Sequence, residues 1–205
     1  TQGSLSRHLV QLALPLVFGN TLQEFYNTID AFVVGRFAGQ EEFAAIGVAG
    51  TVMNLFLFAL VGCCTGFSVL FARAYGHNDM DDLHRQEVSA LTVGLACTGV
   101  LMLLGLAGMR PLLTLLQTPD ALCGYVSVYL RWIFLSLPAA FLYNLFASLL
   151  RSSGDTQAAL LVLAAAVGAN LVLDFVFVAG FSGGIEGAAI ATALTQVFSA
   201  LVCYG

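Results

Sequence analysis

Residues 157–180 read QAALLVLAAAVGANLVLDFVFVAG, an almost wholly apolar run that contains Asn170 and Asp174. A helix needs about 20 predominantly apolar residues to cross the hydrocarbon core of a membrane. The run is long enough for this, and it lacks the apolar–polar alternation of a barrel strand. It therefore predicts a membrane-spanning helix with an amide and a carboxyl group on one face, because residues four apart share a face.

The rest of the chain has the same character. Of its 205 residues, 59% are hydrophobic and 9% are charged, whereas soluble domains contain about 25% charged residues. The connecting segments are too short to hold a soluble domain. We therefore predict an all-α membrane protein, a bundle of six transmembrane helices forming one lobe over residues 1–205. The expected helices are 9–36, 43–75, 88–108, 122–149, 157–180 and 185–205.

Charge and motifs exclude several classes of protein. The chain has seven basic and twelve acidic residues, a formal net charge of −5. Without an arginine cluster to neutralise phosphates, it is expected to have membrane lipid but no nucleic acid as a partner. The five cysteines show no spacing typical of a zinc site, and the apolar runs hold no Ser/His pair or HExxH motif. We therefore expect neither an enzyme nor an organic cofactor.

The arginines and the chain ends predict orientation and extent. Cytoplasmic loops carry an excess of Lys and Arg, and four arginines on one side against three on the other favour a cytoplasmic N-terminus in the inner (plasma) membrane. The chain begins without methionine and stops in its last apolar run, so we expect a fragment of a longer protein. The two groups are Arg7, Arg73, Arg85 and Arg151 against Arg36, Arg110 and Arg131.

The first apolar run carries a polar stripe. At 100° per residue, Asn20, Gln23, Asn27 and Asp30 fall within about 80° of one another, and Glu24 lies beside them. Ionisable groups inside a membrane helix are costly, so this stripe should face protein or water rather than lipid. A structural hydrogen-bonded seam between helices is the alternative interpretation.

Residues from the first, fifth and sixth apolar runs are expected at the same depth in the membrane. Asp30 and Asp174 each lie six residues before the end of their run, and Thr192 lies seven after Ile185. At about 1.5 Å per residue, all three lie about 9–11 Å below the same membrane boundary, with Asn170 one turn deeper. Two carboxylates, an amide oxygen and a hydroxyl suit a hard cation, and the two carboxyls could equally hold a proton. The spacing leaves both interpretations open.

Several segments resemble one family of transporters. They are Leu14-Pro15 with residues 20–39 (NTLQEFYNTIDAFVVGRFAG), 74–79 (AYGHND), 150–156 (LRSSGDT) and 187–192 (GAAIAT). Together they resemble the multidrug and toxic compound extrusion (MATE) transporters, over essentially the whole chain. The family fold has twelve helices in two six-helix lobes. The chain is similar to the N-terminal lobe, so we expect its own C-terminal lobe as a partner outside this chain.

The resemblance implies a function and a site. It implies a proton- or sodium-coupled antiporter that exports organic, often cationic, drugs and toxins by alternating access. It also implies a cation site at Asp30, Asn170, Asp174 and Thr192, where a sodium ion is the only metal expected. A lipid-linked saccharide flippase of related architecture is the alternative. Its lumen would be expected to need basic residues for phosphate, and the centres of the predicted helices contain no arginine.

A second set of residues is a candidate for binding substrate or lining the lumen: Asn20, Gln23, Glu24, Asn27 and Gln196. Glu24 departs from the family, which more often has an uncharged residue there. It could extend the cation site or recognise a cationic substrate, and it could equally snorkel or pair with an arginine.

Two other patterns indicate structure rather than function. Gly62 and Gly66 form a GxxxG motif, which predicts a close contact between helices. Aromatic residues of the fourth run are typical of an interfacial belt: Tyr125, Tyr129 and Trp132.

Overall fold

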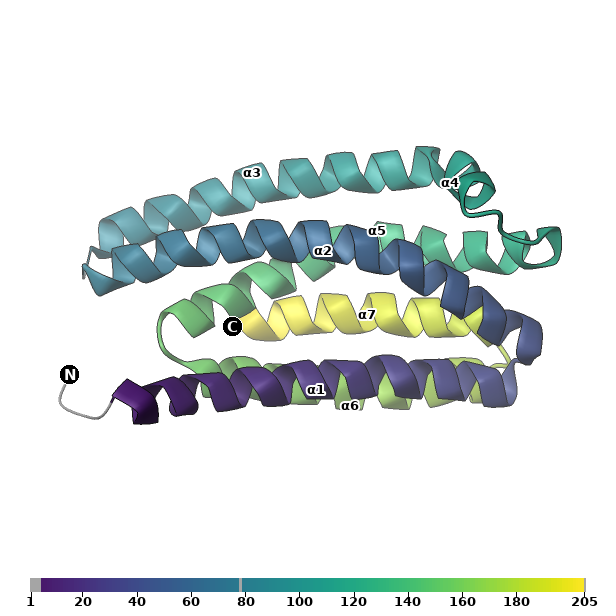
Figure 1. Cartoon of the computed structure of the whole chain (residues 1–205), viewed down its shortest axis with the longest axis horizontal. Coiled ribbons are helices and arrows are strands. Elements are labelled where there is room, and N and C mark those ends of the chain that lie inside the picture. Colours follow the sequence, from purple (N-terminus) through teal and green to yellow (C-terminus); the bar gives the residue numbers. More distant parts are fainter. Residues whose placement is uncertain (1–4, 78, 205) are drawn as a thin grey trace.

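The computed structural model describes residues 5–77 and 79–204, without the side chains of residues 5–16, 20, 26 and 27. These residues form one elongated helical bundle (Figure 1). Its elements are α1 (Leu5–Phe37), α2 (Gln40–Gly76), α3 (Met80–Ala107), α4 (Met109–Leu115), α5 (Asp120–Ser152), α6 (Thr156–Asp174), η1 (Phe175–Gly180) and α7 (Gly184–Tyr204).

Helices occupy all six expected ranges, and most ends shift by only a few residues. The third helix was predicted to begin at residue 88, and it begins eight residues earlier, at Met80. Residues 157–180 form α6 together with η1, a π-helical segment, and the short helix α4 lies in the expected connection between the third and fourth runs. Five of the described helical segments are long and apolar enough to span a membrane: α2, α3, α5, residues 156–180 and α7. The helix α1 has 33 residues and lies alongside α6 (Figure 1).

The helix starts follow from short polar residues at the turns. The carboxylate of Asp79 accepts a hydrogen bond from the Asp82 amide at 2.9 Å and starts α3. Asp155 does the same for α6, through the Ala158 amide at 2.9 Å. Such N-caps satisfy amide groups that have no partner within the helix. The turn before α6 also uses Gly154, whose φ of 91° favours glycine.

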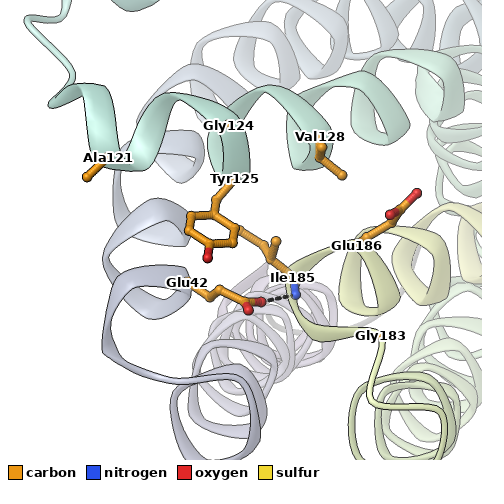
Figure 2. A pocket seen from close by; sticks show the side chains of 8 residues that line it. All are labelled: Glu42, Ala121, Gly124, Tyr125, Val128, Gly183, Ile185 and Glu186. Carbon is orange, nitrogen blue, oxygen red and sulfur yellow. Dashed lines mark hydrogen bonds between the residues drawn. The ribbon is translucent and has the colours of Figure 1, made fainter.

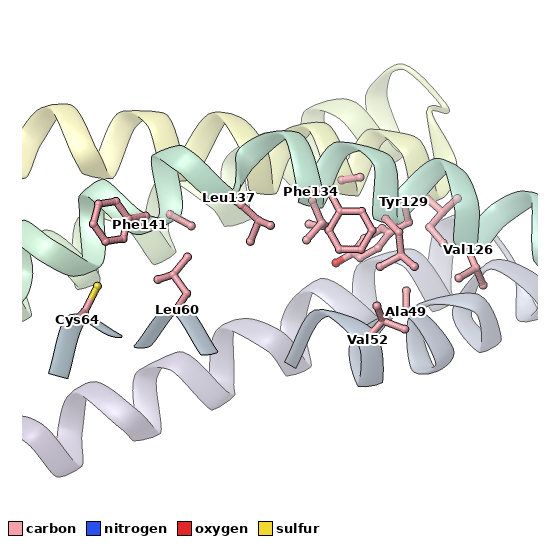
Figure 3. Close-up of a cluster of buried hydrophobic side chains, with 14 of the residues drawn as sticks. Ala49, Val52, Leu60, Cys64, Val126, Tyr129, Phe134, Leu137 and Phe141 are labelled. Atoms are coloured by element: carbon pink, nitrogen blue, oxygen red, sulfur yellow. The ribbon is translucent and has the colours of Figure 1, made fainter. Parts of the chain in front are cut away.

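The hydrophobic core surrounds α5, which contacts α2, α3 and α7. Figure 3 shows Phe134 and Phe141 of α5 among the buried side chains. The neighbouring helix α3 presents glycines to both rings. A Cβ at Gly105 would lie 2.9 Å from the Phe134 ring, and one at Gly94 would overlap the Phe141 ring. Glycine therefore lets α3 approach α5 closely.

The predicted GxxxG contact is wrong within this lobe. Gly62 and Gly66 are exposed on α2, and no described atom lies within 4 Å of a Cβ added at either. The close contact through glycine occurs instead at Gly94 and Gly105, which are eleven residues apart on α3. The spacing of two glycines indicates that another helix can approach closely. It does not indicate which helix does so, or on which face.

The connections between helices lie at the two opposite ends of the bundle. The N-terminal end of α1 lies with the α2–α3 and α5–α6 turns, and the other connections lie at the opposite end (Figure 1). Arg73 and Arg151 occupy the last turns of α2 and α5, and Arg36 occupies the last turn of α1. The two groups of arginines therefore separate between the ends as expected, although the side chain of Arg7 lies outside the described ones.

Candidate functional site

Two carboxyl groups meet in the interior of the bundle. Asp174 is the last residue of α6 and has no exposed surface, and Asp30 of α1 is 6% exposed. The two groups lie close enough to interact with each other, and the phenol of Tyr129 from α5 lies beside Asp30. One acid comes from α1 and the other from α6. They can meet because these two helices pack along each other.

The protein leaves these acids largely without donors. Among the described residues, Oδ1 of Asp30 and both carboxyl oxygens of Asp174 accept no hydrogen bond. A buried carboxylate without a partner is strongly unfavourable, and two adjacent ones repel each other as well. A proton or a cation between the two groups would remove both costs.

Asn170 and Thr192 place further polar side chains in the interior of the bundle. Asn170 lies one turn before Asp174 on α6 and is 2% exposed, and Thr192 of α7 is 6% exposed. The helices α1, α6 and α7 contact one another. The structure thus places all four predicted site residues in the interior, on three helices that pack together.

The backbone changes its geometry directly after Asp174. Residues Phe175–Gly180 form η1, in which the hydrogen bonds have the wider π spacing. The Phe177 carbonyl accepts the Gly183 amide at 2.9 Å, and a Cβ at Gly187 would lie 2.8 Å from the same oxygen. Such π segments occur frequently at functional sites. Nothing in the apolar sequence FVFVAG predicts one.

The sequence model of the MatE family matches residues 15–176. The chain belongs to the MatE family.

This MatE chain resembles known members over nearly its whole length. It is 31% identical over 199 residues to the probable multidrug resistance protein YpnP of Bacillus subtilis (strain 168), covering 96% of this chain and 44% of YpnP. It is 24% identical over 207 residues to the multidrug export protein MepA of a Staphylococcus saprophyticus strain, covering 98% of this chain and 44% of MepA. A crystal structure of MATE in the bent conformation matches with a TM-score of 0.90 and 26% identity, covering 98% of this chain and 45% of that one.

These matches confirm the resemblance and the fold class. The MatE chain is an integral membrane protein with the fold of a half-transporter, and its family consists of transporters rather than enzymes. It spans less than half the length of the relatives it matches.

Tyr129 is the site residue that the sequence reasoning missed. The interpretation of Tyr129 as part of an interfacial belt is wrong, because its side chain is only 2% exposed and lies next to Asp30. It lies nine residues after Asp120 in this MatE chain, about 13 Å along the helix at 1.5 Å per residue. This depth is close to the roughly 9–11 Å expected for Asp30 and Asp174, so the position of Tyr129 along its helix could have indicated it. Trp132 has a partner as well, since its indole N–H donates to Glu186 at 3.2 Å.

The candidate lumen-lining residues lie on less covered surface. Gln23 and Glu24 are exposed on α1, and Gln196 is half-buried on α7. The side chains of Asn20 and Asn27 lie outside those that the structure describes. The backbone carbonyl of Glu24 accepts the Thr28 hydroxyl at 2.8 Å, and in the described part of the MatE chain its carboxylate forms no ion pair with an arginine.

A separate cavity of about 370 Å³ lies where α2, α5 and α7 meet (Figure 2). Glu42 and Tyr125 point toward one another across it, and the Glu42 carboxylate accepts a hydrogen bond from the Ile185 amide at the start of α7. The predicted helices 9–36 and 43–75 leave Glu42 in the connection between them. The structure makes it a cap that ties α2 to α7. Among the described residues, no group of three or more His, Cys, Asp or Glu side chains could hold a metal ion.

Proposed function

We propose that the chain is the N-terminal half of a cation-coupled exporter of organic, often cationic, compounds. Two observations support this. The chain belongs to a transporter family, and relatives that it matches are named for multidrug resistance and multidrug export. The matched length, 44–45% of those relatives and structures, suits one lobe of two, so a second lobe completes the transporter.

The buried pair of Asp30 and Asp174 carries the proposal. Three of its four carboxyl oxygens accept no hydrogen bond from a described residue, so the pair is stable only when a proton or a sodium ion occupies it. Each charge moved across the whole membrane gains about 2.3 kcal/mol per 100 mV. Occupancy of such a site therefore responds both to the ion gradient and to the membrane potential.

The other site residues have distinct roles in this proposal. Asn170 and Thr192 supply an amide oxygen and a hydroxyl oxygen to a bound sodium ion, and the Tyr129 hydroxyl orients the carboxyl group of Asp30. If the ion is a proton, the two carboxyls share it and the same polar groups stabilise the pair. Binding then favours one packing of α1 against α6 and α7, which is the differential interaction that alternating access requires.

The proposed substrate surface is the uncovered face of α1. Glu24 is exposed there without a cationic partner among the described residues, and exposed Phe25 and Phe32 lie on the same helix. A negative charge next to aromatic rings favours organic cations. Closing this face against a second lobe would form the lumen.

The test is transport by the complete protein reconstituted in vesicles with an imposed sodium or proton gradient. We expect gradient-driven efflux of a cationic dye, abolished by Asp174→Asn, and the gradient that drives it identifies the ion. The matched control is Asp81→Asn, which changes an exposed carboxylate on α3. Undiminished efflux by Asp174→Asn would disprove the coupling site. Movement of a lipid-linked saccharide in place of the dye would establish the flippase instead.

A further inference from the structure

A larger cavity lies at the end of the bundle opposite the first turn of α1. Its volume is about 610 Å³, and it is formed by α4, the loop after it and the first turns of α5. Figure 1 shows α4 at the corner where α3 ends and α5 begins. None of the residues that line this cavity lies on α1, α6 or α7, the helices that carry Asp30, Asp174 and Thr192. The transport proposal assigns no role to this cavity.

Two opposite charges line this cavity without neutralising each other. Arg110 lies on α4 and Asp120 in the first turn of α5, and both side chains are exposed. Neither forms an ion pair with the other or with any further described residue. A ligand that carries both a negative and a positive group could therefore bind both of them at once.

Neutral polar groups in the same cavity also lack partners in the described chain. The Thr118 hydroxyl oxygen is buried and accepts no hydrogen bond. The side chains of Gln117 and Ser127 line the cavity and appear in no hydrogen bond between described residues. Gln117 has a φ of 50°, a conformation that non-glycine residues rarely adopt and that occurs often at ligand sites.

The surroundings of the cavity are those of a membrane boundary. The helices α3 and α5 are both long and apolar enough to span the membrane. Leu103 and Leu104 near the end of α3 and Leu115 at the end of α4 are exposed, the last at 79%. Acyl chains can therefore lie along α3 while a polar group enters the cavity.

We propose that this cavity binds the headgroup of a zwitterionic amino-phospholipid, with its phosphate on Arg110 and its ammonium on Asp120. The guanidinium presents paired N–H donors that match two phosphate oxygens. Asp120 repels a purely anionic headgroup and accepts hydrogen bonds from a primary ammonium. A quaternary ammonium has no N–H to donate, so phosphatidylethanolamine fits better than phosphatidylcholine.

The test measures lipid retained by the complete, purified transporter after incubation with vesicles of phosphatidylethanolamine, phosphatidylcholine or phosphatidylglycerol, using native mass spectrometry. We expect preferential retention of phosphatidylethanolamine. Loss of one charge-assisted contact should reduce its retention about ten-fold in Arg110→Gln. Asp120→Asn should abolish the preference over the other two lipids. The matched control is Arg131→Gln, which changes an exposed arginine of α5 outside the cavity and should retain lipid like the wild type.

Several results would overturn the proposal. Equal retention of the three lipids by the wild type would show that the two charges do not select the headgroup. Unchanged retention in Arg110→Gln, or an equal loss in Arg131→Gln, would place the lipid elsewhere. Displacement of the lipid by soluble phosphoethanolamine at equal concentration would identify a site for a free phosphate compound. A thermal unfolding curve for each variant establishes that loss of lipid does not reflect loss of fold.

Discussion

At the scale of single residues, Asp174 shows what it costs to bury a carboxyl group without hydrogen-bond donors. Its carboxyl group has no exposed surface and both of its oxygens lack a hydrogen bond among the described residues. A side chain in this position stabilises the fold only when something positive accompanies it. The coupling ion of the proposed transporter therefore also acts as a structural component of the lobe.

Asp174→Asn should uncouple stability from the ion. Asparagine keeps the shape and removes the charge, so we expect the variant to unfold at a temperature no lower than the unliganded wild type. Saturating ion should stabilise the wild type by about 2–4 kcal/mol and the variant hardly at all, because a ligand stabilises only the state that binds it. Thermal unfolding of the complete transporter against sodium concentration and against pH measures this. Equal stabilisation of both proteins would contradict it.

Tyr129→Phe isolates one hydroxyl next to the acid pair. The ring remains in the core, so we expect a loss of stability of about 1 kcal/mol for the hydrogen-bonding group and a weaker response to the ion. The control is Tyr125→Phe, one turn earlier on α5, where the ring lines the cavity of Figure 2. A weaker ion response in the control but not in Tyr129→Phe would place the ion beside Tyr125 instead.

At the scale of elements, the contact between α3 and α5 depends on the absence of a side chain. A methyl group at Gly94 would overlap the Phe141 ring, which is buried. The two helices must then separate, or the ring must leave its position. Because interiors are closely packed, neither adjustment is confined to one residue.

Gly94→Ala should therefore destabilise the lobe by about 1–3 kcal/mol, the usual cost of overpacking a core. Gly99→Ala on the same helix is the matched control, since no described atom lies within 4 Å of its added Cβ. We expect the control to be neutral or slightly stabilising, because alanine favours a helix. Thermal unfolding or denaturant titration of both variants in detergent distinguishes them, and equal effects would rule out the close contact.

The sequence predicted the helices better than it predicted their faces. Runs of about 20 apolar residues set the helices, and matched depths indicated Asp30 and Asp174 correctly as buried neighbours. Tyr129 was missed, and Gly62 was assigned a contact that it does not make, because both depend on which helix packs against which. The π geometry of η1 was also missed, since nothing in its apolar sequence indicates it.

At the scale of the whole molecule, much of the exposed surface of the lobe is apolar. Large apolar side chains are exposed on several helices, among them Phe25, Phe58, Leu103 and Leu161. In an integral membrane protein such surface faces lipid or another part of the transporter. The two ends of the bundle hold the connections, and their sides of the membrane define the topology of the lobe.

Cysteine labelling should place the two ends of the bundle on opposite sides of the membrane. Glu41 at the start of α2 and Gln157 at the start of α6 are both exposed and lie at opposite ends. With the native cysteines replaced by serine, we expect Gln157→Cys to react only from the cytoplasm and Glu41→Cys only from outside. Reaction of both from one side would contradict the topology, and the reverse assignment would place the N-terminus outside.

The π segment after Asp174 also determines where the chain tolerates a change of length. A π turn holds one residue more than an α turn, so η1 contains one residue more than an α-helical turn would, between Asp174 and the glycine-containing turn before α7. Removing one residue from 175–180 lets the backbone close into α turns without rotating Asp174, which belongs to the helix before it. Removing one from α6 between its Asp155 cap and Asp174 would turn the carboxyl by about 100° away from Asp30. Natural insertions and deletions in this part of the fold should therefore fall after the acid and not before it.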